Sequence, residues 1–184
     1  MKNITSCTFF ALLLLFVEGF SQSPAPAAKE FKTKTGKVIT VAETHPTGAS
    51  LSNLRVAFKG NSGSAVQFTD VDPVNRVLVA DLDGDGFSEI YIITLSAGTG
   101  SYGNVIGLAS LRDKSLSMIT FPEVGEGDLK KGAKFEGYEG HDLYEINQNT
   151  LVRTFPVKAP KPAKHVVKYR LKAGEASLKL VITD

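Results

Sequence analysis

Four carboxylates lie close together in the stretch DLDGDGFSE, the acidic loop, which runs from Asp81 to Glu89. They stand at positions one, three, five and nine: Asp81, Asp83, Asp85 and Glu89. Hard cations such as calcium are bound by several carboxylate oxygens around a tight, glycine-bearing turn. The spacing predicts a structural calcium site, whereas the alternative is a metal-free β-turn whose aspartates accept hydrogen bonds from backbone amides. Position twelve is Ile92 rather than a bidentate glutamate, so this is not an EF-hand loop.

A glycine-rich stretch follows, LSAGTGSYGN from Leu95 to Asn104. Its segment Gly98–Gly103 matches the pattern G-x-G-x-x-G, which binds dinucleotide phosphates when a helix follows the loop. The next residues, Val105 to Ala109, are apolar, β-branched or glycine, which is typical of a strand. We therefore reject a dinucleotide site. Two interpretations remain, a plain hairpin turn or a stiff loop that enters the cleft of a partner protein.

The composition of this glycine loop, residues 96–103, favours the second interpretation. It combines hydroxyl groups, glycines that allow close backbone approach, and one tyrosine. A tyrosine offers a large contact area with a polar tip and has few torsions to freeze, so it is a common anchor in interfaces. The candidate partner-binding residues are Ser96, Gly98, Thr99, Gly100, Ser101, Tyr102 and Gly103.

The elements that must hold these two loops are predicted to be strands. Short runs rich in Val, Ile, Thr, Phe and Tyr recur along the chain between turn residues, and none has a sustained helical period. The runs are KVITVAE, NLRVAFKG, SAVQFTD, NRVLVADL, EIYIITLS, NVIGLASL, SLSMITF, NTLVRTFPV, HVVKYRLK and SLKLVITD. They predict an all-β fold, a single-domain antiparallel β-sandwich or flattened barrel. The charged, glycine-rich stretch from Glu123 to Gly140 is predicted to be a long surface excursion.

The N-terminus is predicted to be a signal peptide. Its apolar run Phe9–Val17 has the length of a leader core and is too short to span a bilayer. Small residues follow, so we expect residues 1–21 to be removed by cleavage near Ser21–Gln22 and the mature protein to be periplasmic or secreted. Residues 22–37 have the Pro/Ala and then Lys/Thr composition of a flexible linker, which leaves 38–184 as the β domain.

Charge and reactive residues argue against several other functions. The net charge is +2, and apart from the segment 158–168 the basic residues are spread along the chain, so nucleic-acid binding is not expected. The single cysteine lies in the leader, and no second apolar run is long enough for a membrane span. His45, His141 and His165 are scattered without zinc-ligand spacing. His141 and Asp142 are adjacent, and adjacent strand residues point to opposite faces, which disfavours a catalytic pair. We therefore predict no enzyme activity and no required cofactor.

The segment SAGTGSYG, between two predicted strands, resembles the signature loop of bacterial periplasmic inhibitors of lysozyme, especially those directed at the i-type (invertebrate) enzymes. The resemblance covers residues 81–111 and continues more weakly through 137–157. It implies an antiparallel β fold, secretion to the periplasm, a lysozyme partner and often a homodimer. The family motif Ser-Gly-x-Tyr aligns with Thr99, Gly100, Ser101 and Tyr102, so threonine stands where the family has serine.

The sequence therefore predicts a lysozyme inhibitor that inserts its glycine loop into the active-site cleft. Lysozymes cleave a glycosidic bond with carboxylates in a cleft shaped for sugars. We expect the hydroxyl of Thr99 to donate a hydrogen bond to the acid carboxylate of the enzyme, and Tyr102 to occupy a neighbouring sugar subsite. The loop glycines are expected to give a narrow profile and any positive φ that the loop needs. The alternatives are a calcium-stabilised secreted β-sandwich module that binds glycan or protein, and a hydrolase without a recognisable motif.

Overall fold

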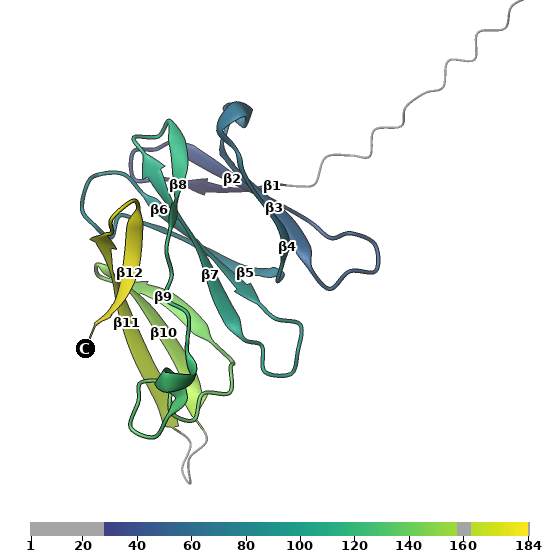
Figure 1. Ribbon diagram of the computed structural model, residues 1–184. Coiled ribbons are helices and arrows are strands. Elements are labelled where there is room, and N and C mark those ends of the chain that lie inside the picture. The colour runs from purple at the N-terminus through teal and green to yellow at the C-terminus, as the bar shows by residue number, and fades with distance from the viewer. Residues whose placement is uncertain (1–27, 158–162, 184) are drawn as a thin grey trace, which may run out of the picture.

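The chain forms three four-stranded antiparallel sheets, each built from strands that are consecutive in the sequence (Figure 1). The computed structural model describes residues 28–157 and 163–183. The first sheet contains β1 (Ala28–Lys32), β2 (Val38–Thr44), β3 (Ser52–Phe58) and β4 (Val66–Val71). The second contains β5 (Val74–Ala80), β6 (Glu89–Leu95), β7 (Gly103–Leu111) and β8 (Ser115–Ile119). The third contains β9 (Leu143–Asn147), β10 (Thr150–Val157), β11 (Ala163–Ala173) and β12 (Leu178–Thr183).

The second sheet is the centre of the fold because both of its faces are buried. On β6, Ile90 and Ile92 belong to an apolar cluster shared with β2 and β3 of the first sheet. Tyr91 and Ile93 alternate with them and belong to a cluster shared with the third sheet. A strand that is buried on both faces needs a near-continuous apolar run, which the sequence EIYIITL supplies. The loops at the two ends of β6 are therefore carried by a strand whose first six residues are buried.

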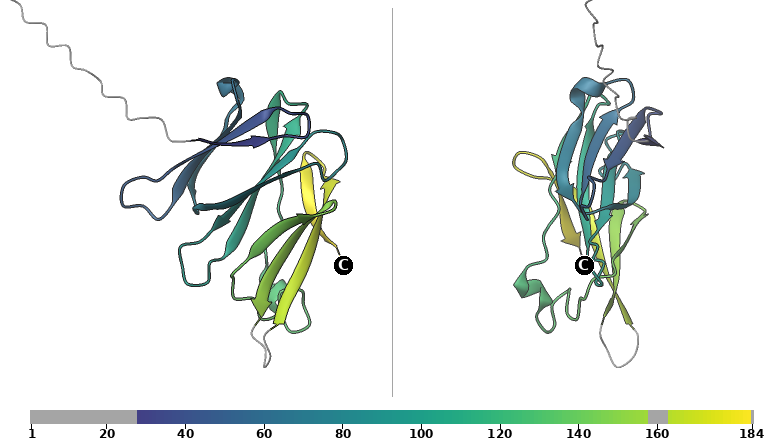
Figure 2. Two further views of the ribbon diagram at one scale, coloured as in Figure 1. Left: turned by 180° about the vertical axis from the view of Figure 1, so that it is seen from behind. Right: turned by 90° about the vertical axis from the view of Figure 1, so that its right-hand side faces the viewer.

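The connection from β8 to β9 contributes to the core. It contains the short 3-10 helix η2 (Glu126–Leu129), and Figure 2 shows it near the end of β10, where Tyr138 forms a bridge to Val157. The sequence predicts a surface excursion here, but Phe135 is 1 % exposed and stacks on Phe155 with ring centroids 5.3 Å apart. The excursion is therefore pinned to the third sheet by aromatic side chains. A second 3-10 helix, η1 (Ser62–Ser64), lies between β3 and β4.

The predicted all-β class is confirmed, and each of the ten predicted runs overlaps a strand. The sheets do not close into a barrel, and there are three of them, where the simple sandwich has two. Two strands were not predicted. The sequence places residues 28–32 in the flexible linker, but they form β1, which pairs with β2 through backbone hydrogen bonds. Only Phe31 of β1 is partly buried, so its sequence has little apolar alternation. β9 is short and lies among charged residues.

The predicted signal peptide, its cleavage site and residues 22–27 of the linker lie outside the described residues. Within the described ranges, no helix is both long enough and apolar enough to cross a membrane.

Candidate functional site

The glycine loop is the connection between β6 and β7, and it is closed by its own hydrogen bonds. The amide of Ser96 donates to the carbonyl oxygen of Tyr102 (3.0 Å), and the amide of Tyr102 donates to Oγ of Ser96 (2.9 Å). The amide of Ser101 donates to the carbonyl oxygen of Gly98 (3.0 Å). Six of the seven predicted partner-binding residues therefore lie in one compact hairpin connection, and the seventh, Gly103, begins β7.

The tip of the loop faces solvent. Gly98 and Thr99 are exposed, and the side chain of Tyr102 is 49 % exposed. The edge of the Tyr102 ring packs against Tyr138, with centroids 5.6 Å apart and planes at 75°. This contact fixes the ring on one side and leaves the other side accessible to a partner.

Two glycines of the loop, Gly100 and Gly103, are required for close packing rather than for backbone conformation. None of the loop glycines has a positive φ, whereas Ser101 has φ 42°. The expectation that these glycines supply the positive φ of the loop is therefore wrong. A Cβ at Gly100 would overlap the ring of Tyr102, and a Cβ at Gly103 would lie 2.6 Å from Cβ of Asp142. Gly98 has open space where its Cβ would be.

The residues just before β9, together with Tyr144 in β9, form hydrogen bonds to the glycine loop. The amide of His141 donates to the carbonyl oxygen of Gly100 (2.6 Å). Gly140 has φ +89°, and a Cβ on it would overlap the same carbonyl. One Oδ2 of Asp142 accepts a hydrogen bond from the amide of Gly103 (2.7 Å), and the hydroxyl of Tyr144 donates to the carbonyl oxygen of Gly103 (3.3 Å). The middle of the glycine loop and its C-terminal end are thus attached to residues about forty positions later in the chain.

A buried ion pair stands behind these contacts. Asp142 is 4 % exposed and Arg153 is 2 % exposed. Nε of Arg153 donates to Oδ1 of Asp142 (2.6 Å), and a terminal nitrogen of Arg153 donates to Oδ2 (3.1 Å), which makes the pair bidentate. The hydroxyl of Tyr138 donates to Oδ2 of Asp142 (2.6 Å) and accepts from Arg153 (2.5 Å). Asp142 pairs with Arg153 here, not with the neighbouring His141.

The surroundings of Arg153 and Tyr138 keep both groups protonated. Burial lowers the pKa of Arg153, but its hydrogen bonds to Asp142 and the nearby negative charge together outweigh burial, and the pKa is raised. Burial, and then the hydrogen bond to Asp142, raise the pKa of the Tyr138 phenol, so it stays protonated as a donor. The guanidinium carbon of Arg153 also lies 4.8 Å from the ring centroid of Tyr138 and 5.0 Å from that of Phe135. The ring of Tyr138 therefore connects the ion pair to Tyr102.

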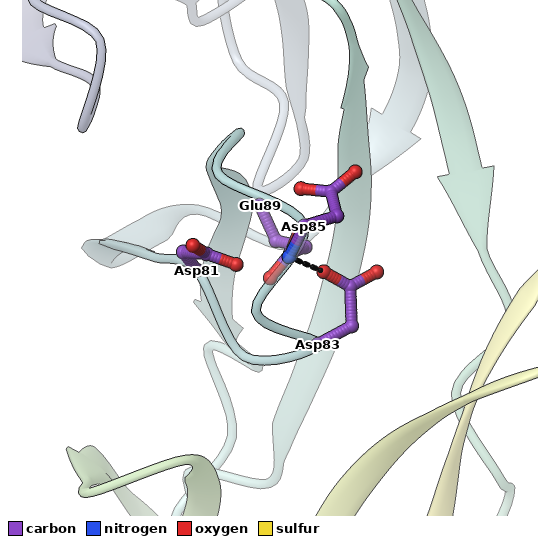
Figure 3. Close-up of side chains that lie close together, drawn as sticks. All are labelled: Asp81, Asp83, Asp85 and Glu89. Carbon is purple, nitrogen blue, oxygen red and sulfur yellow. Dashed lines mark hydrogen bonds between the residues drawn. The ribbon is translucent and has the colours of Figure 1, made fainter.

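The acidic loop is the connection between β5 and β6, at the other end of β6 (Figure 3). Its four carboxylates come together as predicted, with one oxygen from each lying within 4.8 Å of the others: Asp81, Asp83, Asp85 and Glu89. The backbone of the loop also donates to them. Asp81 accepts from the amides of Gly84 (2.8 Å) and Gly86 (3.1 Å). The amide of Asp85 donates to Asp83 (3.1 Å), so the aspartates cap backbone amides as the second interpretation of the sequence expects, and the calcium site stays a prediction.

Charge is distributed unevenly over this cluster. Glu89 is 2 % exposed, and burial together with the neighbouring aspartates raises its pKa to about 8, although the amide of Leu82 donates to its Oε2 (2.6 Å). Burial alone would raise the pKa of Asp81, but the ammonium group of Lys34 (2.6 Å) and the amides of Gly84 and Gly86 together outweigh burial and lower it. Burial raises the pKa of Asp83. The four carboxylates have the oxygen chemistry that calcium prefers, and a cation there would relieve their mutual repulsion.

Comparisons with known proteins add a distant similarity. No protein-family model matches the chain, and no curated protein sequence matches it. A crystal structure of PliI-Ah, the periplasmic lysozyme inhibitor of I-type lysozyme from Aeromonas hydrophyla, is similar over 51 % of this chain and 86 % of that chain, with 21 % identity and a TM-score of 0.39. A similarity at this level assigns neither a family nor a function.

The sequence placed both loops correctly in the fold but missed the residues that hold the glycine loop. Tyr138, Asp142 and Arg153 were not among its candidates. One signal was present, because Arg153 stands inside the apolar run LVRTFPV. A cation at an inward-facing position of a buried strand needs a buried anion. The anion itself could not be chosen from the sequence, since several acids precede it.

Proposed function

We propose that the protein is a periplasmic or secreted inhibitor of lysozyme, with i-type enzymes favoured, and that it inserts residues 96–103 into the active-site cleft. The observation that carries the proposal is that the segment SAGTGSYG is exposed at its tip and fixed at its base. It forms a hairpin connection whose tip is exposed and whose base is tied to a buried ion pair. The resemblance of this segment to the family loop selects lysozyme as the partner.

The chemistry of the loop suits a cleft that binds sugar hydroxyls. Thr99 is exposed, and its hydroxyl would donate to the acid carboxylate of the enzyme, an interaction with a charged group that contributes about 1.5–3 kcal/mol. Tyr102 would fill a neighbouring subsite, where a buried tyrosine anchor contributes about 2 kcal/mol or more. Because the loop is already closed on itself and fixed at Gly100 and Gly103, it loses little conformational entropy on binding.

The surface beside the loop provides additional contact area. A hollow of about 620 Å³ adjoins it, lined partly by Gly103, Asn104, Met118 and Phe121. Met118 is among the exposed large apolar side chains. A partner whose cleft receives the loop would cover this hollow with the rim of its cleft, and the apolar contact would add to the affinity.

The experiment is an inhibition assay of the purified protein against lysozymes of the three animal classes, followed by calorimetry on any pair that responds. The Tyr102→Ala variant should bind about 2 kcal/mol more weakly. Leu111→Ala is the matched control, because Leu111 is 51 % exposed and lies at the opposite end of β7, so its affinity should not change. Absence of inhibition in every class would remove the proposal, and equal effects of both variants would remove the role of Tyr102.

A second candidate function is a calcium-stabilised module that binds glycan or protein. It is favoured by the four carboxylates within 4.8 Å of one another. Calcium there would be structural, because it would fix the turn that leads into β6. Glycan binding in calorimetry without lysozyme binding would support this candidate over the inhibitor. The homodimer that the resemblance implies is a separate proposal, and sedimentation equilibrium tests it.

A further inference from the structure

The outward face of the third sheet gathers basic side chains that are separated in the sequence. Along β11, alternate residues point outward and are exposed: Lys164, Val166, Lys168, Arg170 and Lys172. The residues between them, Val167, Tyr169 and Leu171, are buried in the core. The alternation of β11 therefore places the basic residues of this short segment on one face of the sheet.

The neighbouring strands extend this face. Lys172 lies opposite Lys179 of β12, so five basic residues share it: Lys164, Lys168, Arg170, Lys172 and Lys179. On β9, Glu145 lies in the same cross-strand row as Lys168 through Val152. It is the one acid on the outward positions of these strands within the described residues. None of the five basic side chains forms an ion pair with another described residue, so their charges are available to an anion.

The centre of the face is hollowed. A depression of about 460 Å³ is lined by amides, hydroxyls and two of the cations: Asn147, Gln148, Thr150, Lys168, Arg170 and Thr183. Its boundary toward the acidic loop is set by Asp83, which lines the adjoining hollow together with Arg170 and Lys172. The depression itself has no carboxylate in its described lining. It offers hydrogen-bond donors for hydroxyl groups beside fixed positive charges.

We propose that this face binds an anionic polysaccharide. Alternate residues of a strand are about 6.6–6.8 Å apart, so the row along β11 matches charges that repeat along an extended chain. Amide and hydroxyl groups between the cations suit sugar hydroxyls. Single-stranded nucleic acid is disfavoured because its bases stack on aromatic rings, and the aromatic residues of these strands point inward. A lipid surface is disfavoured because, among the described residues of this face, Leu143 and Val166 alone are exposed large apolar groups. This inference does not rest on the proposed inhibition of lysozyme.

The test uses the purified protein, a heparin decasaccharide as the sulfated glycan probe, and calorimetry at low ionic strength. The Lys168→Gln/Arg170→Gln double variant should weaken heparin binding by about five-fold or more, since it removes both charges from the depression. Lys29→Gln/Lys32→Gln on β1 is the matched control, with the same loss of charge on a different sheet, and should change binding by less than about two-fold. Both double variants should keep the circular dichroism spectrum of the parent.

Four results would overturn the inference. They are the absence of saturable heparin binding, equal weakening by the two double variants, binding of neutral dextran as tight as that of heparin, and tighter binding of oligothymidylate or phosphatidylglycerol vesicles than of heparin. Binding of heparin that weakens with added salt and is lost selectively in Lys168→Gln/Arg170→Gln would support it.

Discussion

The acidic loop and the glycine loop are the two connections of β6, and they are stabilised in opposite ways. The acidic loop is held mainly by its own residues, since its aspartates accept hydrogen bonds from amides two to five positions later. The glycine loop depends on distant residues, because Gly103 is fixed by Asp142, which is 39 positions away. A loop of the first kind can be recognised in a short stretch of sequence, whereas the second kind requires the fold.

The two loops also differ in how their charged side chains are paired. In the glycine loop the anion is buried with a bidentate cation, and every contact is directional. In the acidic loop four carboxyl groups are close together, and Lys34, an exposed side chain, pairs with Asp81. Glu89 keeps its proton at neutral pH, because its pKa is raised to about 8. The first arrangement is complete by itself. The second brings the carboxylates of Asp81, Asp83 and Asp85 together beside one exposed cation.

The largest effect is expected when the buried pair is broken. Arg153→Leu leaves the carboxylate of Asp142 buried without its cation, and loss of one partner of a buried pair costs about 3–5 kcal/mol. The free energy of unfolding from urea titration measures this. Lys34→Gln removes the exposed cation of the acidic loop and should have a much smaller effect, because water screens that pair.

A double variant tests the reason for the loss. Arg153→Leu combined with Asp142→Asn removes both charges and keeps an acceptor for the amide of Gly103. It should be more stable than Arg153→Leu alone. If the double variant is no more stable, then the packing of the guanidinium among its aromatic neighbours, rather than its charge, accounts for the loss.

The acidic loop could be predicted from the sequence better than the glycine loop, because its contacts are local and those of the glycine loop are distant. The carboxylates of the acidic loop lie within nine residues, so their spacing was enough to predict the cluster. The pattern of glycines predicted a special loop but not its cause, because Gly100 and Gly103 are needed for contact with Tyr102 and Asp142. Such contacts depend on how the excursion and β9 return to the second sheet. The strands were predictable where alternation is strong, and β1 and β9 were missed where it is weak.

The second prediction concerns pH and the acidic loop. The folded-state pKa of Glu89 is raised to about 8 from an ordinary value of 4.5, so the native state holds a proton that the unfolded chain releases. The resulting stability is present in full below about pH 4.5 and is lost as the pH rises to about 8. We expect a loss of roughly 4 kcal/mol across this window without metal, measured by urea titration in EDTA.

Glu89→Gln is the control, because the amide keeps an acceptor for Leu82 and does not titrate. Its free energy of unfolding should vary less over the same window. Calcium should stabilise the parent more at pH 8 than at pH 5, since binding requires ionised carboxylates. Equal stabilisation at both values, or none at either, would contradict a calcium site at this cluster.

A smaller effect is expected from the glycines. Gly103→Ala forces a methyl group against Asp142 and Tyr144, and overpacking of this kind costs about 1–3 kcal/mol. Gly98→Ala meets open space and should change the free energy of unfolding by less than about 0.5 kcal/mol. Thermal or urea unfolding of the two variants gives the difference. Equal losses would mean that the base of the loop is not packed as tightly as its contacts indicate.

A small effect on stability is also expected at Tyr102, near the tip of the glycine loop. Tyr102 is half exposed and touches the supporting network through one edge contact with Tyr138, and such aromatic contacts contribute about 0.5–1.5 kcal/mol. Tyr102→Ala should therefore lower the free energy of unfolding by no more than that, while lowering the affinity for a lysozyme partner by more. A stability loss comparable to that of Arg153→Leu would instead make Tyr102 a part of the core. The proposed division of the loop, with its base serving the fold and its tip serving the partner, would then fail.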